Sequence, residues 1–81
     1  MANVKKYVLF TTPYCVGCKP VKEFLKRATI DGETLDASGE GSEKAVEMGV
    51  RSVPTVVLLD ERGGEVARAS NVSTLRELLS G

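Results

Sequence analysis

The sequence has no histidine and no tryptophan, and only two of its 81 residues are cysteines. Cysteine and histidine are the usual ligands of structural zinc, so this chain alone lacks half of an ordinary four-ligand zinc site. Two cysteines are also too few for the dense disulfide frameworks of small secreted domains. A metal site would therefore need carboxylates or a second copy of the chain, and we expect no metal.

Neither sign of charge is in excess, because 11 lysines and arginines balance 11 aspartates and glutamates. Nucleic-acid binding relies on a basic surface, so we expect no such partner. The longest apolar run, Val53–Leu59, is far shorter than the roughly 20 residues that span a membrane. The first residues also lack the apolar stretch of a secretory signal. These features predict a cytoplasmic protein without a membrane segment.

The length fits one small domain, because a second core would leave both too small to bury enough surface. Hydrophobic residues make up 42% of the chain, which allows one modest core without a metal or disulfide framework. We predict one domain over residues 1–81. No large exposed apolar stripe is evident, so we expect a monomer.

Hydrophobic periodicity predicts an alternation of strands and helices. The runs with strand character are Tyr7–Phe10, Glu33–Ala37, Val53–Leu59 and Glu65–Ala69. Apolar residues recur at helical spacing from Cys15 to about Thr29, around Ala45, Val46 and Met48, and at Val72, Leu75, Leu78 and Leu79. The order β-α-β-α-β-β-α predicts an α/β fold, with a mixed four-stranded sheet flanked by helices on both faces.

Turn and capping residues mark the predicted boundaries. Asp31-Gly32 predicts a turn before the second strand. Ser42 or a nearby serine predicts the cap of the second helix, and Gly49 its end with a positive φ. Ser70 or Asn71 predicts the cap of the last helix.

The sequence Cys15-Val16-Gly17-Cys18 lies where the first predicted strand leads into the first predicted helix. Unpaired amides and the helix dipole favour a thiolate there, and Gly17 leaves the space beside the sulfurs free. In the mechanism that this placement supports, Cys15 attacks a substrate disulfide, and Cys18 then attacks Cys15 to release the reduced substrate. A lone CxxC is also half of a zinc site, but we interpret this pair as redox-active.

Two motifs together resemble the thioredoxin superfamily. Thr-Thr-Pro-Tyr-Cys-Val-Gly-Cys-Lys occupies residues 11–19, and Gly-Val-Arg-Ser-Val-Pro-Thr occupies residues 49–55. The short chain and its Cys-Val-x-Cys motif are most similar to the NrdH-redoxins and to compact phage or prokaryotic thioredoxins. The resemblance implies a thioredoxin-like fold with a cis Val53–Pro54 bond beside the active-site disulfide, and no cofactor. It also implies a substrate-binding surface made of Tyr14, Val16, Gly17, Val53 and Pro54.

The chain departs from the proteins that it resembles at three places. Leu9 stands where full thioredoxins place a buried aspartate, so water or another carboxylate would have to serve as the acid–base partner of Cys18. Tyr14 resembles glutaredoxins, yet Val16-Gly17 is not the glutaredoxin Pro-Tyr. Ala69-Ser70-Asn71 stands where glutaredoxins carry the Gly-Gly and acidic residue that hold glutathione.

The resemblance implies a thiol–disulfide oxidoreductase that reduces protein disulfides. Ribonucleotide reductase is one candidate electron acceptor, and thioredoxin reductase is the expected source of electrons. The alternative is a glutaredoxin that takes its electrons from glutathione. A third, less favoured reading is a non-catalytic binding module whose cysteines are dispensable.

Overall fold

The computed structural model describes residues 4–28 and 30–80 of the chain. The elements, in order, are β1 (Lys6–Thr11), α1 (Cys18–Arg27), β2 (Asp31–Asp36), α2 (Ser42–Glu47), β3 (Thr55–Leu59), β4 (Glu65–Ala69) and α3 (Val72–Ser80). This confirms the predicted element order. None of the helices in the described ranges is long and apolar enough to cross a membrane.

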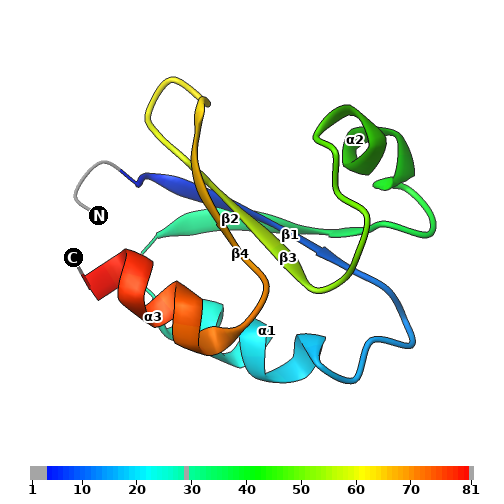
Figure 1. The fold of residues 1–81 in the computed structure, drawn as a ribbon, viewed down its shortest axis with the longest axis horizontal. Coiled ribbons are helices and arrows are strands. Elements are labelled where there is room, and N and C mark those ends of the chain that lie inside the picture. Colours follow the sequence, from blue (N-terminus) through cyan, green and yellow to red (C-terminus); the bar gives the residue numbers. More distant parts are fainter. Residues whose placement is uncertain (1–3, 29, 81) are drawn as a thin grey trace.

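The four strands form one mixed sheet in the order β2-β1-β3-β4. Strand β1 pairs with β2 in parallel, and the pairs β1–β3 and β3–β4 are antiparallel. Helices α1 and α3 cover one face of this sheet and the short helix α2 lies on the other (Figure 1). The predicted fold class is therefore confirmed.

The two inner strands supply a core to each face, because successive side chains of a strand point to opposite sides of the sheet. Leu9 packs with Val21 and Leu25 of α1 and with Leu75 of α3. The neighbouring residues of β1, Val8 and Phe10, pack instead with Ala45 of α2 and Val57 of β3. Leu9, in the position of the thioredoxin aspartate, is thus an ordinary core residue with 1% of its surface exposed.

Helix α1 begins at Cys18, three residues later than predicted. The N–H groups of Cys18 and Lys19 donate to the carbonyls of Cys15 and Val16, three residues back, as in a tight turn. Pro20 has no N–H, so it cannot make the bond to Val16 that a helix starting at Cys15 would need. Cys15 therefore lies in the turn that precedes the helix.

Strand β2 begins at Asp31, so the predicted turn at Asp31-Gly32 is wrong. Gly32 lies opposite Tyr7 in the parallel pairing of β1 and β2. A Cβ atom added to Gly32 would come within 2.3 Å of the Tyr7 ring. The glycine leaves room for this ring, whereas the sequence pattern suggested a chain reversal.

The cap of α2 also differs from the prediction. Gly41 is the N-cap and no side chain caps the helix, so Ser42 is its first residue. A Cβ atom at Gly41 would lie 2.7 Å from the Cβ atom of Leu35, and this contact favours glycine over a capping serine. Gly49 ends the helical segment with a φ of 70°, as predicted.

The remaining boundaries follow the sequence closely. Asn71 caps α3, because its Oδ1 accepts a hydrogen bond of 2.8 Å from the N–H of Thr74. Strand β3 begins at Thr55, two residues later than predicted. Pro54 has no N–H to donate to a strand neighbour, so regular pairing starts after it.

Candidate active site

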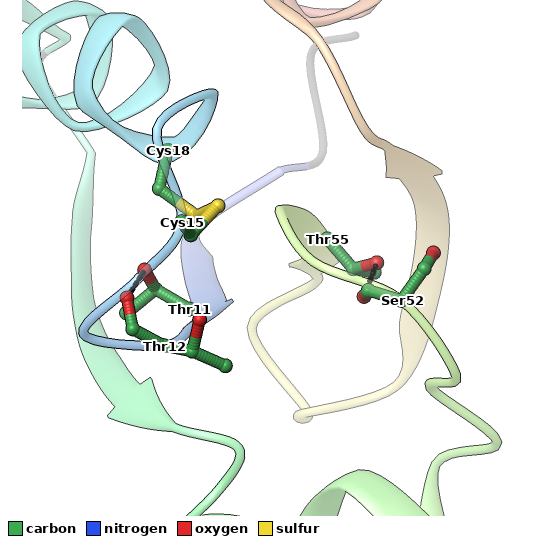
Figure 2. Close-up of a disulfide and its surroundings, with 6 residues drawn as sticks. All are labelled: Thr11, Thr12, Cys15, Cys18, Ser52 and Thr55. Carbon is green, nitrogen blue, oxygen red and sulfur yellow. Dashed lines mark hydrogen bonds between the residues drawn. A yellow bond between two sulfur atoms is a disulfide. The ribbon is translucent and has the colours of Figure 1, made fainter.

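The cysteine pair lies in the segment that joins the end of β1 to the start of α1. The N–H of Cys15 donates to the carbonyl of Thr12 at 3.2 Å, which folds this segment back on itself. Cys15 and Cys18 form a disulfide, and their Cα atoms lie 5.3 Å apart (Figure 2). This separation is within the ordinary range for a disulfide, so the fold holds the two residues at bonding distance.

The two sulfur-bearing residues differ in their access to solvent. Cys15 is half-buried, whereas Cys18 has 1% of its surface exposed. An incoming disulfide can therefore reach Cys15 far more easily than Cys18.

The start of α1 offers a positive electrostatic environment to this pair. Gly17 is the N-cap, it provides no side-chain hydrogen bond, and no acidic residue lies in the first turn. The N–H groups of Cys18 and Lys19 donate to the carbonyls of Cys15 and Val16, and Pro20 has no N–H, but the first peptide groups of the helix still carry the positive end of its dipole. A thiolate beside them is favoured relative to a thiol.

The loop before β3 meets the cysteine loop. The Val53–Pro54 bond is cis, as the resemblance implied. A Cβ atom at Gly17 would lie 3.8 Å from Cδ of Pro54, so these residues are within van der Waals reach. Thr55 fastens the loop, because its hydroxyl donates a 2.7 Å hydrogen bond to the carbonyl of Ser52.

The expected substrate-binding residues are arranged around Cys15. Tyr14 and Val16 are 91% and 89% exposed, which is unusual for side chains of this size and polarity. Gly17 is exposed, while Val53 and Pro54 are half-buried. The structure thus brings Gly17 and Pro54 together and turns the two large apolar side chains outward on either side of Cys15.

A groove of about 290 Å³ runs from the loop before β3 toward α2. The residues along it include Thr12, Ala37, Val46, Val50, Arg51 and Val53. Helix α2 contributes Ser42, Ala45 and Val46 to its wall, and Val46 is 80% exposed.

The sequence motifs did not indicate the hydroxyl groups in the surroundings of the disulfide. Figure 2 shows Thr11 and Thr12 at the end of β1, and Ser52 and Thr55 on the segment that enters β3. Thr11 and Thr55 are 6% and 8% exposed, and among the described residues they are the buried polar side chains. The only signal in the sequence was their place at the ends of buried strands.

Acidic and metal-ligating groups are not concentrated near the cysteines. Every aspartate and glutamate is exposed or half-buried. Within residues 4–28 and 30–80, no three side chains of the kinds that ligate metals lie together in a group that could hold an ion.

Comparisons with known proteins agree with the geometry of the site. The family model for glutaredoxin matches residues 7–62. The SPbeta prophage-derived thioredoxin-like protein YosR of Bacillus subtilis (strain 168) is 40% identical over 57 residues, which cover 70% of each chain. An uncharacterized protein of Treponema pallidum (strain Nichols) is 31% identical over 67 residues, or 83% of this chain and 77% of the other.

Solved thioredoxin structures share the fold. Thioredoxin NaTrxh from Nicotiana alata superposes with a TM-score of 0.78 and 28% identity, over 96% of this chain and 72% of that one. Thioredoxin 1 from Thermosipho africanus gives a TM-score of 0.72 and 26% identity, over 93% of this chain and 86% of that one.

Proposed function

The chain belongs to the glutaredoxin family, within the thioredoxin superfamily, and from this membership we propose that it is a dithiol–disulfide oxidoreductase that reduces protein disulfides. It is a thioredoxin- and glutaredoxin-like redox protein with a Cys15–Cys18 disulfide. The observation that carries the proposal is the contrast between a half-buried Cys15 and a Cys18 that is 1% exposed.

The proposed reaction has two exchange steps. The Cys15 thiolate attacks one sulfur of the substrate disulfide, a mixed disulfide forms, and the other substrate sulfur leaves as a thiolate that takes up a proton. Cys18 then loses its proton, attacks the sulfur of Cys15 and releases the second substrate thiolate. The substrate gains two electrons and two protons, and the protein is left with the Cys15–Cys18 disulfide.

Substrate binding is assigned to the surface around Cys15. Tyr14 and Val16 supply exposed apolar area on either side of the nucleophile. Gly17 leaves space above the sulfurs, and the backbone of Val53 beside Pro54 offers groups that can pair with an extended substrate segment. This surface suits a protein substrate whose disulfide lies in an accessible, extended stretch.

The electron source in this proposal is a thioredoxin reductase, and ribonucleotide reductase is one candidate acceptor. The segment Ala69-Ser70-Asn71 supports the choice over glutathione. Ala69 is buried in the core and the side chain of Asn71 caps α3, and neither residue carries the charge that the acidic residue of glutaredoxins would supply. In this proposal the protein acts as a monomer in the cytoplasm, where thiols are kept reduced.

The glutaredoxin match favours a second candidate, a protein that is reduced by glutathione. The two candidates differ in the molecule that attacks the Cys15–Cys18 disulfide. Glutathione would form a mixed disulfide with Cys15, whereas a thioredoxin reductase would deliver both electrons through its own dithiol.

Coupling to NADPH separates these candidates. The oxidised protein is mixed with NADPH and either thioredoxin reductase or glutathione plus glutathione reductase, and NADPH oxidation is followed with a protein disulfide as the final acceptor. We expect turnover with thioredoxin reductase. Turnover only with glutathione and glutathione reductase would favour the second candidate. Turnover with neither reducing system would contradict both candidates.

The variants Cys15→Ser and Cys18→Ser test whether the cysteines are required at all. A redox carrier loses its activity in both variants, because neither retains the pair of thiols. A binding module would keep its effect on a partner enzyme without them.

A further inference from the structure

The second exchange step places an unusual demand on Cys18. Its thiol must lose a proton before it can attack Cys15, yet the residue is 1% exposed. A buried thiolate is unfavourable unless hydrogen-bond donors face it. No aspartate or glutamate is buried, so the interior supplies no carboxylate for this purpose.

Thr11 is the buried polar side chain best placed to meet this demand. In β1 the side chains of Tyr7 and Leu9 face the core beneath α1 and α3, and strand alternation puts Thr11 on the same face. Thr11 is 6% exposed, and Figure 2 shows it among the residues in the surroundings of the disulfide. A hydroxyl in this position can donate a hydrogen bond to a sulfur.

The hydroxyl of Thr11 is weakly engaged in the oxidised protein. Its hydrogen bond to the carbonyl of Thr12 is 3.4 Å long, at the outer limit for such a bond. The hydroxyl of Thr55, the other buried polar group, makes a short 2.7 Å bond to Ser52 that holds the loop before β3. The Thr11 hydroxyl can therefore rotate and donate to a new acceptor. The Thr55 hydroxyl would first have to give up its short bond to Ser52.

Asp36 is the carboxylate closest to Thr11 in the sheet, since the two residues are paired in the β1–β2 register. Its Oδ1 atom accepts hydrogen bonds from the N–H and the hydroxyl of Ser38, at 2.9 and 2.6 Å. These bonds lower the pKa of Asp36, which makes it a poor proton acceptor for a thiol. On α1, the charge nearest the pair in sequence is the exposed Lys19.

We propose that Thr11 is a positioning residue for Cys18: once the disulfide is open, its hydroxyl donates a hydrogen bond to the Cys18 sulfur and stabilises the thiolate that attacks Cys15. This inference rests on the proposed function. The Cys18 proton passes to the departing substrate thiolate or to water, the Cys15–Cys18 bond forms and the Cys15–substrate bond breaks. Thr11 keeps its own proton throughout.

The test follows the reduced protein as it reacts with the chromogenic disulfide DTNB in a stopped-flow instrument. Attack by Cys15 releases the first coloured thiolate, and attack by Cys18 releases the second, so the two steps are seen separately. The variants are Thr11→Val, which keeps the shape, and Thr11→Ser, which restores the hydroxyl. Thr34→Val, on the exposed strand β2, is the matched control, and Asp36→Asn tests the competing carboxylate.

We expect Thr11→Val to slow the second release about tenfold at neutral pH, which corresponds to a rise of about one unit in the pKa of the Cys18 thiol. The first release should be unchanged, and Thr11→Ser and Thr34→Val should behave like the wild type. A titration of thiolate absorbance in a Cys15→Ser background should show the same rise in pKa with Thr11→Val.

Three results would overturn the inference: an unchanged second release in Thr11→Val, a Thr11→Ser variant as slow as Thr11→Val, or a loss that appears with Asp36→Asn instead. Failure of the proposed function would look different. In that case the wild type itself would release no second thiolate, whatever residue stands at position 11.

Discussion

Single residues in this chain are selected by close contacts that the sequence pattern does not reveal. Gly32 is the clearest case, since the Tyr7 ring fills the space where a side chain would be. We predict that Gly32→Ala destabilises the protein by about 1–3 kcal/mol, because the ring or the strand must shift. Urea unfolding of Gly39→Ala is the control, as a Cβ atom there lies 3.5 Å from its nearest neighbour. Equal unfolding midpoints for the two variants would contradict this explanation.

Asp36 makes the free energy of unfolding depend on pH in the acidic range. The hydrogen bonds from Ser38 lower the pKa of its carboxyl below the ordinary value of 3.8. Because the folded pKa is the lower one, this stabilisation is complete above pH 3.8 and is lost as the pH falls through the lowered value. We predict that Asp36→Asn is less stable than the wild type at neutral pH and that the difference shrinks toward about pH 2. A difference that is the same at both pH values in urea unfolding would argue against a role for the charge.

At the scale of elements, the last helix depends on its cap. Asn71 satisfies the N–H of Thr74, one of the donors that a helix start leaves unpaired. We predict that Asn71→Ala lowers the free energy of unfolding by about 1 kcal/mol. Asn71→Asp should retain most of this stabilisation, because aspartate also caps helices. Thermal unfolding of both variants measures this. If alanine and aspartate gave the same loss, the capping hydrogen bond would not be the cause.

The order and type of the elements could be predicted from the sequence, because each buried face leaves a periodic signal. The strand Glu65–Ala69 matches the structure, and Asn71, one of the two residues predicted as the α3 cap, is the cap. The starts of α1 and β3 were predicted too early, and the turn and cap errors occurred where a glycine has a close tertiary contact. Gly32 was predicted as a turn residue, because the sequence does not show that Tyr7 lies against it. Ser42 was predicted as a cap, because the sequence does not show that Leu35 lies against Gly41.

The whole molecule brings together two segments that are distant in sequence. The antiparallel register pairs Phe10 with Thr55, so the end of β1 and the start of β3 meet at one end of the sheet. The segment that follows β1 carries the cysteines, and the segment that precedes β3 carries Pro54. Their contact at Gly17 is therefore a consequence of the topology.

This topology also explains how much of the site the sequence could indicate. The cysteine spacing and the cis Pro54 could be expected from motifs, and the structure contains both the disulfide and the cis bond. The burial of Thr11 could not be expected, because a threonine at a strand end has the same local pattern whether it is exposed or buried. Only the placement of α1 over the end of β1 distinguishes these cases.

The central claim, that Cys15 attacks and Cys18 resolves, is tested most directly by trapping the mixed disulfide. Reduced Cys18→Ser and Cys15→Ser variants are each mixed with a protein that carries an accessible disulfide, and the products are weighed by intact-mass spectrometry. We predict a stable one-to-one adduct through Cys15 in Cys18→Ser, released by added dithiol, and little or no adduct in Cys15→Ser. An equal or greater yield of adduct through Cys18 would contradict it.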